Sequence, residues 1–149
     1  MLIRCATSED SDAMLVLLNQ LFGVEQDFCF DAPTQHRGLA MLLASSLARV
    51  FVAEAEGAVR GMATGQLVVS TAQGGLSVLV EDVVVDEGWR RRGIGTLLLA
   101  ELQRWASSQG AGRMQLLADR DNETGLMWYR RHGWQHTNLI CLRNTSWNY

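Results

Sequence analysis

The stretch VVVDEGWRRRGIGT, residues 83–96, decides how this chain folds. A β-branched run leads into a loop with two glycines, and apolar residues then recur at helical spacing. Positions 94, 97, 98, 102, 105 and 106 carry Ile, Leu, Leu, Leu, Trp and Ala, which is the i, i+3, i+4 pattern of an amphipathic helix. We therefore expect a buried strand, a glycine-containing loop, and a helix that ends near Gly110 and Gly112.

The start of this helix is a candidate phosphate-binding site. The first backbone N–H groups of a helix lack partners inside the helix, and the helix dipole makes that end positive. An anion placed there accepts several N–H bonds at once. Gly93 and Gly95 allow the backbone to approach phosphate oxygens where a Cβ atom would collide, and three arginines precede them. The alternative is a plain surface loop with a glycine turn.

Other phosphate-binding and catalytic motifs do not fit the spacing. A P-loop needs a lysine after its second glycine, and the chain contains no lysine. A dinucleotide-binding loop needs a third glycine where this chain has Leu98. The three cysteines are widely spaced, so we predict no metal site. No HExxH or Ser-His-Asp arrangement indicates a hydrolase, and a nucleophilic pair of Cys29 with His36 has no further support in the sequence.

Length and composition bound the class of protein. A chain of 149 residues with 48% hydrophobic and 19% charged residues matches one globular domain, and we predict a single domain over residues 1–149. The net charge of −3 and the short basic cluster argue against a nucleic-acid binder. No apolar run approaches the ~20 residues that span a bilayer, and no leader pattern begins the chain. We expect a soluble cytoplasmic protein that binds neither nucleic acid nor membrane.

Hydrophobic periodicity and turn signals predict the order βααβββαβαββ, a mixed α/β domain. Thr7 and Asp10 have the spacing of a capping box before the first helix, and Pro33 suits the first turn of the second. The inward faces of these helices are expected at 14, 17, 18 and 21 and at 39, 42, 43 and 47. Strands are expected at 1–6, 49–56, 59–69, 76–85, 114–118, 134–136 and 139–142, and a short helix at 124–132.

Beyond this local chemistry, the sequence resembles the GNAT superfamily of N-acetyltransferases. RRRGIG at 90–95 is similar to that family's Gln/Arg-x-x-Gly-x-Gly/Ala signature, and EDVVV precedes it at 81–85. Downstream, WY at 128–129 and GW at 133–134 stand where the family has Phe/Tyr-Tyr and Gly-Phe. The likeness covers most of the chain, most specifically residues 80–134. It implies a GNAT-like fold in which two parallel central strands, 76–85 and 114–118, splay apart around a thioester.

The resemblance implies acetyl-CoA as the cosubstrate, without a metal, and indicates the residues that would hold it. The strand before the loop would contact the pantetheine arm, and the loop amides would bind the pyrophosphate. Asn122 would touch the same arm, or would only cap the short helix. The implied cofactor-binding residues are Val83, Val84, Val85, Arg90, Arg91, Arg92, Gly93, Ile94, Gly95, Thr96 and Asn122.

The resemblance also implies two catalytic groups. Tyr129 would act as the general acid that protonates the departing thiolate, since a phenol has a pKa of about 10; the alternative is a tyrosine that packs in the core. Glu81 would accept a proton from the ammonium substrate, directly or through water, unless it is a strand-end carboxylate paired with an arginine. Strand alternation places Glu81 and Asp82 on opposite faces, so only one of them would reach the site.

The acceptor is expected to be a primary amine that attacks the thioester directly in a ternary complex. Acidic residues at 25, 27, 31, 119 and 121 would favour a cationic acceptor, although solvated loop charge is the commoner explanation. Two alternatives remain open: a non-catalytic acyl-CoA-binding or sensing module of the same fold, and a partner-binding domain with no cofactor. The resemblance favours a homodimer over a monomer.

Overall fold

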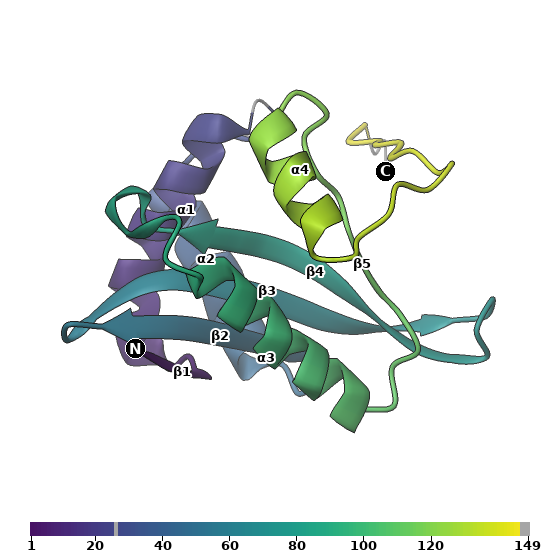
Figure 1. Cartoon of the computed structure of the whole chain (residues 1–149), viewed down its shortest axis with the longest axis horizontal. Coiled ribbons are helices and arrows are strands. Elements are labelled where there is room, and N and C mark those ends of the chain that lie inside the picture. The colour runs from purple at the N-terminus through teal and green to yellow at the C-terminus, as the bar shows by residue number, and fades with distance from the viewer. Residues whose placement is uncertain (26, 147–149) are drawn as a thin grey trace. The chain divides into compact units, whose positions relative to one another are not determined.

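The computed structural model describes residues 1–25 and 27–146, and the chain divides into two compact units, Met1–Leu116 and Leu117–Tyr149. The first unit contains the sheet with helices α1, α2 and α3, and the second contains helix α4 (Figure 1). None of the helices in this described part has the length and apolarity needed to span a bilayer.

The first unit is built on a sheet with the strand order β1-β2-β3-β4-β5. Neighbouring strands are antiparallel except β4 and β5, which are parallel. Glu56 and Gly57 close the β2–β3 hairpin with φ angles of 52° and 72°, as the predicted turn requires. The strands are β1 (Leu2–Cys5), β2 (Ala48–Ala55), β3 (Ala58–Ser70), β4 (Gly75–Val85) and β5 (Met114–Leu116). The helices of this unit are η1 (Ser8–Asp10), α1 (Ser11–Val24), α2 (Ala32–Ala44), η2 (Glu87–Trp89) and α3 (Ile94–Ser108).

Helix α3 covers one face of the sheet, and α1 and α2 cover the other (Figure 1). On the α3 face, Leu98 and Leu102 are fully buried. A Cβ atom on Gly65 would lie 2.9 Å from Leu102 Cδ2 and 3.0 Å from Val78 Cγ1, so the missing side chain lets α3 approach the sheet closely. The opposite face has its own core, whose buried members are Met14, Leu17, Leu18, Leu39, Val50, Val52, Met62 and Val84.

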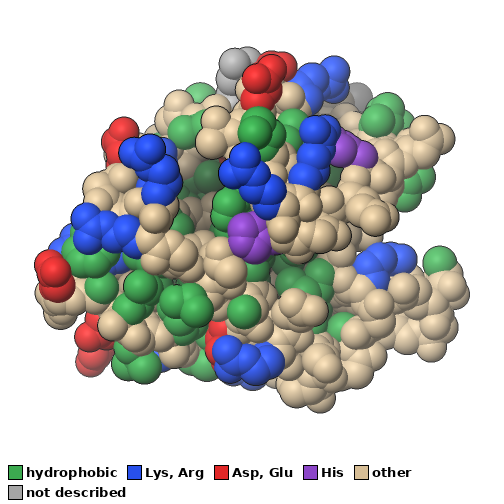
Figure 2. All heavy atoms as spheres, viewed as in Figure 1, with side chains coloured by type: hydrophobic (Ala, Val, Ile, Leu, Met, Phe, Trp, Pro, Cys, Tyr) green, Lys and Arg blue, Asp and Glu red, His purple; other side chains and the backbone are tan. Residues whose placement is uncertain are grey.

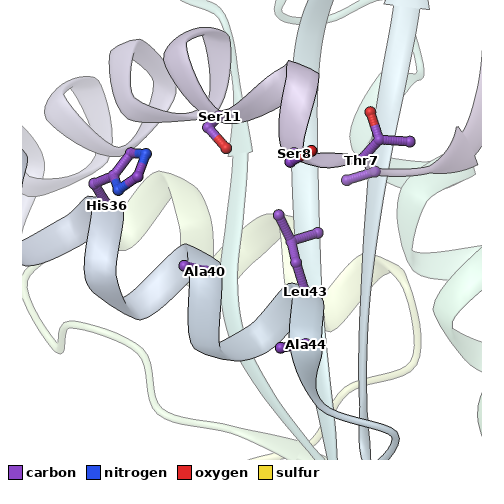
Figure 3. A pocket seen from close by; sticks show the side chains of 8 residues that line it. Thr7, Ser8, Ser11, His36, Ala40, Leu43 and Ala44 are labelled. Atoms are coloured by element: carbon purple, nitrogen blue, oxygen red, sulfur yellow. The ribbon is translucent and has the colours of Figure 1, made fainter.

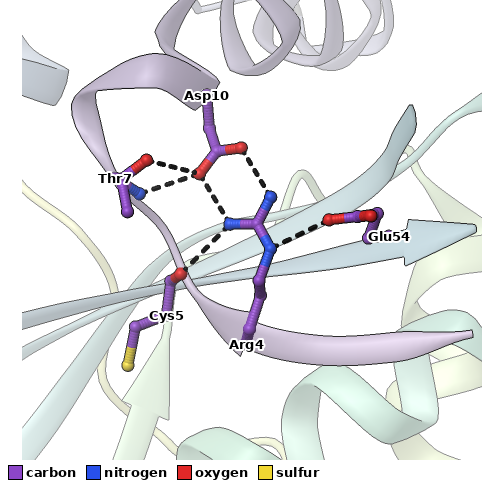
Figure 4. A network of polar contacts seen from close by, with 5 residues as sticks. All are labelled: Arg4, Cys5, Thr7, Asp10 and Glu54. Atoms are coloured by element: carbon purple, nitrogen blue, oxygen red, sulfur yellow. Dashed lines mark hydrogen bonds and ion pairs between the residues drawn. The ribbon is translucent and has the colours of Figure 1, made fainter. Parts of the chain in front are cut away.

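A polar network fixes the corner where β1 turns into the first helical segment (Figure 4). The Arg4 guanidinium donates to both carboxylate oxygens of Asp10 at 2.8 Å and to Glu54 Oε2 at 3.0 Å. The backbone N–H of Thr7 donates to Asp10 Oδ2 at 2.8 Å, which confirms the predicted capping box. The Arg4 guanidinium lowers the pKa of the buried Asp10 carboxyl to about 2. One arginine therefore ties β1 to η1 and to β2.

The second unit contains α4 (Glu123–Arg131). Asn122 caps this helix, because its Oδ1 accepts from the backbone N–H of Gly125 at 3.0 Å. After the helix, Gly133 has a φ of 83°, which favours glycine at this position. The Tyr129 ring packs edge-on against Trp128 and Trp134, with centroid separations of 5.0 and 5.6 Å.

The predicted order βααβββαβα is confirmed, but the last two predicted strands are wrong. Residues 134–136 and 139–142 form no strand, and Leu139, Ile140 and Leu142 are more than 80% exposed. Apolar composition raises strand propensity, but a strand forms only when a hydrogen-bonded neighbour is available. As a result β5 is the edge of the described sheet and not a central strand.

Two leucines were also assigned to the wrong environment. Leu47 lies beyond the end of α2, in the turn before β2, and is 59% exposed. Leu97 lies within α3 but is 45% exposed, while its neighbour Leu99 is buried. Helical spacing alone cannot show where a helix ends, or which edge of a broad apolar stripe meets the sheet.

Candidate active site

A β-bulge interrupts β4 at the two carboxylates singled out by the sequence. Gly65 of β3 pairs with Val80, and Ala63 pairs with Val83, so that Glu81 and Asp82 together lie opposite the single residue Thr64. The predicted alternation of Glu81 and Asp82 is therefore wrong, because a bulge breaks the two-residue period. Glu81 is exposed and Asp82 is partly buried.

The bulge directs the Asp82 carboxyl onto Thr64. The Thr64 hydroxyl donates to Asp82 Oδ2 at 3.2 Å and accepts from the backbone N–H of Asp82 at 3.0 Å. Thr64 is fully buried and lies directly opposite Val50, a member of the core beneath α1 and α2. Burial raises the pKa of Asp82 to about 6, with a further contribution from the charge of Glu81, and the bond from Thr64 opposes this rise. Thr64 and the raised pKa of Asp82 could not be predicted from the sequence, because strand alternation gives no sign of a bulge.

Strand β4 continues beyond the reach of β5. The parallel pairing extends from Val78 with Met114 to Val80 with Leu116 and then stops, which agrees with the expected divergence of these strands. The N–H of Asp86 donates to the carbonyl of Arg60 on the β3 side. Since successive residues direct their polar groups to opposite edges, Val83 and Val85 direct theirs away from β3, and Val84 towards it.

The loop after β4 has the form of an anion-binding turn. Gly93 has a φ of 80° and precedes the first residue of α3, and Arg91 has a φ of 61°. A Cβ atom on Gly93 would meet no other atom within 4 Å, so the space beside this residue is open. Among the described residues, no protein group accepts a hydrogen bond from the backbone N–H of Arg91, Arg92 or Gly93. The loop thus presents unpaired donors next to the positive end of α3.

The arginines of this loop are exposed, and basic side chains are visible on the left of Figure 2, the side on which the β4–α3 loop lies in Figure 1. Arg90 Nε donates to the carbonyl of Val85 at 3.2 Å, and Arg92 Nη2 donates to the carbonyl of Gly88 at 3.4 Å. No ion pair joins any of the three arginines to a carboxylate of the described residues. Their positive charge is therefore available to an anion.

The remaining predicted site residues lie in several parts of the chain. Tyr129 and Asn122 belong to the second unit, and the side chain of Asn122 is already used as the helix cap. Asp31 likewise caps α2, since its carboxylate accepts from the backbone N–H of Thr34 at 3.1 Å, and the pKa of Asp31 is lowered by hydrogen bonds from Thr34. Asp119 Oδ1 accepts from the N–H of Asp121 at 2.8 Å. Local capping and turn bonds thus account for Asp31 and Asp119.

A separate cavity of about 420 Å³ lies between α2 and the start of α1 (Figure 3). His36 and Leu43 of α2 and the hydroxyl side chains of Ser8 and Ser11 line it. None of the residues predicted to bind the cofactor or the acceptor lines this cavity. Within the described residues, no group of three or more His, Cys, Asp or Glu side chains is arranged to hold a metal ion.

Comparison with known proteins shows the family. The model of the acetyltransferase (GNAT) family matches residues 13–134. A possible acetyltransferase from Clostridium difficile 630 has a similar structure, with 17% identity, a TM-score of 0.86, and coverage of 99% of this chain and 98% of that one. The aminoglycoside N-acetyltransferase AAC(6')-Iy, solved in complex with CoA, has 21% identity, a TM-score of 0.82, and coverage of 97% and 94%.

A third similar structure is an aminoglycoside acetyltransferase, meta-AAC0020, from an uncultured soil metagenomic sample, in complex with sisomicin. It has 19% identity and a TM-score of 0.76, with coverage of 99% of this chain and 96% of that one. No curated protein matches the sequence. The solved structures share the fold, and the family model matches the strand, loop and helix described above. The chain therefore belongs to the acetyltransferase (GNAT) family.

Proposed function

We propose that this protein transfers an acetyl group from acetyl-CoA to a primary amine. The observation that carries the proposal is the loop before α3, where unpaired amides, open space beside Gly93 and exposed arginines fit a pyrophosphate. Hydrogen bonds to a charged group contribute roughly 1.5–3 kcal/mol each, so a few of them anchor such a group. Acetyl-CoA would supply the activated acetyl thioester.

The free edge of β4 suits the pantetheine arm. Of the three valines predicted to contact it, Val83 and Val85 direct their polar backbone groups to this edge, while Val84 faces β3 and has a buried side chain. The carbonyl of Val85 already accepts from Arg90. We therefore assign the main pantetheine contact to the backbone of Val83, with the N–H of Val85 as a second donor.

In the proposed reaction the amine nitrogen attacks the thioester carbonyl carbon, and the carbon–sulfur bond breaks. Before the attack, the ammonium group loses one proton to a carboxylate on β4, directly or through water. The thiolate takes a proton from Tyr129, and the second proton, lost by the nitrogen as the amide forms, restores the Tyr129 phenol. Glu81 remains the predicted base, and Asp82, with its raised pKa, is the second candidate. Most of the rate enhancement would come from positioning the two substrates together.

A thermal shift with acetyl-CoA tests the binding step. A ligand present at 100 times its Kd stabilises the folded protein by about 2.7 kcal/mol, so the Tm is expected to rise measurably. Gly93→Glu is expected to abolish the shift, because the new side chain occupies the open space and repels phosphate. An acetyl-CoA titration that leaves the wild-type Tm unchanged would refute the proposal and favour a partner-binding domain without a cofactor.

Release of free thiol in the presence of an amine panel tests turnover. Because two similar structures are aminoglycoside acetyltransferases, the panel includes aminoglycosides besides polyamines, amino acids and peptide N-termini. Thiol release with any of these amines supports the enzyme. Tight acetyl-CoA binding with no turnover of any amine would instead favour a sensing module. The homodimer, the cytoplasmic location and the single domain over residues 1–149 stay predictions, and light scattering checks the first.

A further inference from the structure

The indole of Trp89 is packed against two guanidinium groups from different parts of the first unit. Arg60 Cζ, from β3, lies 4.8 Å from the ring centroid, and Arg92 Cζ, from the loop before α3, lies 4.5 Å from it. Both distances fall within the range of cation–π attraction. We call these three side chains the Trp89 clamp, because they join the start of β3 to the loop before α3.

Further hydrogen bonds and an ion pair fix the start of the loop to β3 and to α1. The N–H of Asp86 donates to the carbonyl of Arg60 at 2.9 Å, and Asp86 Oδ2 lies 3.5 Å from Arg60 Nη1. The other carboxylate oxygen of Asp86 accepts from the N–H of Gly88 at 3.2 Å. Gln20 of α1 accepts from the N–H of Glu87 at 3.0 Å. Arg60 Nε is buried and has no hydrogen-bond partner within the described residues, which is an unfavourable environment for this side chain.

The loop has a backbone conformation that needs such support. Arg91 has a φ of 61°, a left-handed conformation that costs a non-glycine residue free energy and persists where surrounding contacts hold it in place. The clamp residues Trp89 and Arg92 lie on either side of this position in the sequence. The two charges of the clamp also differ, since Asp86 pairs with Arg60 while Arg92 has no carboxylate partner among the described residues.

We propose that Arg60 and Trp89 are positioning residues for acetyl-CoA, which hold the loop and the Arg92 guanidinium in the conformation that receives the pyrophosphate. This inference rests on the proposed function. Arg60 acts through Trp89, and Trp89 acts through the loop backbone. Without the clamp, the loop would sample other conformations, and binding would have to select the competent one. Affinity for acetyl-CoA would fall, whereas the chemical step of the bound complex would not change.

Steady-state kinetics of Trp89→Ala and Arg60→Met provide the test. Each variant is expected to raise the KM for acetyl-CoA roughly tenfold, with kcat at saturating acetyl-CoA within about twofold of wild type. Trp89→Phe keeps an aromatic face and is expected to recover most of the affinity. The matched control is Arg49→Met, since Arg49 stacks on Trp105 at 5.8 Å far from the loop in sequence, and its KM is expected to stay at the wild-type value.

The outcomes separate this inference from the proposed function. If wild-type protein neither binds nor turns over acetyl-CoA, the proposed function fails. If wild type binds and Arg60→Met keeps the wild-type KM, or lowers kcat without changing KM, the clamp has no positioning role. Should Trp89→Ala not fold, or should no amine be turned over, calorimetric binding of acetyl-CoA to Arg60→Met gives the same decision, with Trp89→Phe expected to bind nearly as tightly as wild type. If Arg49→Met raised the KM for acetyl-CoA as much as Arg60→Met does, the inference would also be overturned.

Discussion

At the residue scale, Asp82 shows how a local irregularity changes the chemistry of a side chain. A carboxyl on a regular strand would have pointed to one face or the other, but the bulge brings Asp82 onto the buried hydroxyl of Thr64. Burial then raises its pKa to about 6. A carboxylate kept in an environment that disfavours its charge is a candidate functional group, because packing alone would not retain it.

Replacing this carboxylate is expected to stabilise the protein at neutral pH. The folded-state pKa of about 6 lies above the ordinary value of 3.8, so the folded protein holds the Asp82 proton more tightly and loses stability as the pH rises between these values. Asp82→Asn should therefore raise the free energy of unfolding at pH 7 by up to about 3 kcal/mol. Urea unfolding at pH 4 and pH 7 checks this, and equal differences at both pH values would contradict it.

The proposed general acid leads to a kinetic prediction. Tyr129→Phe removes the hydroxyl group, which carries the only acidic proton of the side chain, while preserving the ring that packs against Trp128 and Trp134. We expect kcat to fall about 10²-fold or more, in the range of general acid catalysis, with the Kd for acetyl-CoA within a few-fold of wild type. Stopped-time thiol assays and calorimetry give the two values. Turnover at the wild-type rate would remove Tyr129 from this role.

The sequence predicted the local form of the loop before α3 more reliably than the environments of single side chains. The glycines and arginines of residues 90–95 predicted the loop correctly, because their conformation depends on local backbone freedom and charge. Thr64 and Arg60 were missed, because each matters only through a partner about 20–30 residues away. No spacing rule within one segment connects such pairs.

At the element scale, the contact between α3 and the sheet depends on glycine. A methyl group at Gly65 would meet Leu102, Val78 and Trp105 at 2.9–3.2 Å, and these side chains are buried and have little room to move. Gly65→Ala is expected to destabilise the protein by about 1–3 kcal/mol through overpacking. Chemical unfolding provides the measurement, with Gly38→Ala on α2 as the control, because nothing lies within 4 Å of its added methyl group. Equal effects in both variants would argue against tight packing at Gly65.

Elements with strong periodicity were predicted close to their observed bounds, as α1, α3 and the hairpin of β2 and β3 show. Prediction failed where an element depends on a partner. The apolar residues near 139–142 have the composition of a strand, yet β5 is only three residues long and its pairing ends at Leu116. Strand propensity is a property of one segment, whereas a strand forms only when a second segment pairs with it through hydrogen bonds.

At the scale of the whole molecule, acid is expected to weaken the fold at the Arg4–Asp10 ion pair. Asp10 has a folded-state pKa of about 2, below its ordinary 3.8, so its contribution is complete above pH 4 and is lost as the pH falls towards 2. Asp10→Asn should cost roughly 2 kcal/mol at pH 7, and the difference from wild type should shrink below pH 4. Thermal unfolding across this pH range tests the sign. If the difference in stability between Asp10→Asn and wild type did not depend on pH, the lost stability would come from packing and not from the charge of Asp10.

The bulge in β4 also adds one residue that the strand does not need in order to keep its other side chains on their faces of the sheet. Residues before it and after it keep their assigned faces only because Glu81 and Asp82 together take the place of one. Deleting either Glu81 or Asp82 would restore an ordinary ladder and leave Val84 pointing into the same core, whereas deleting an interior residue of β4 before the bulge would move the preceding side chains to the opposite face of the sheet. Because the fold does not require the extra residue of the bulge, natural selection can choose that residue for its chemistry.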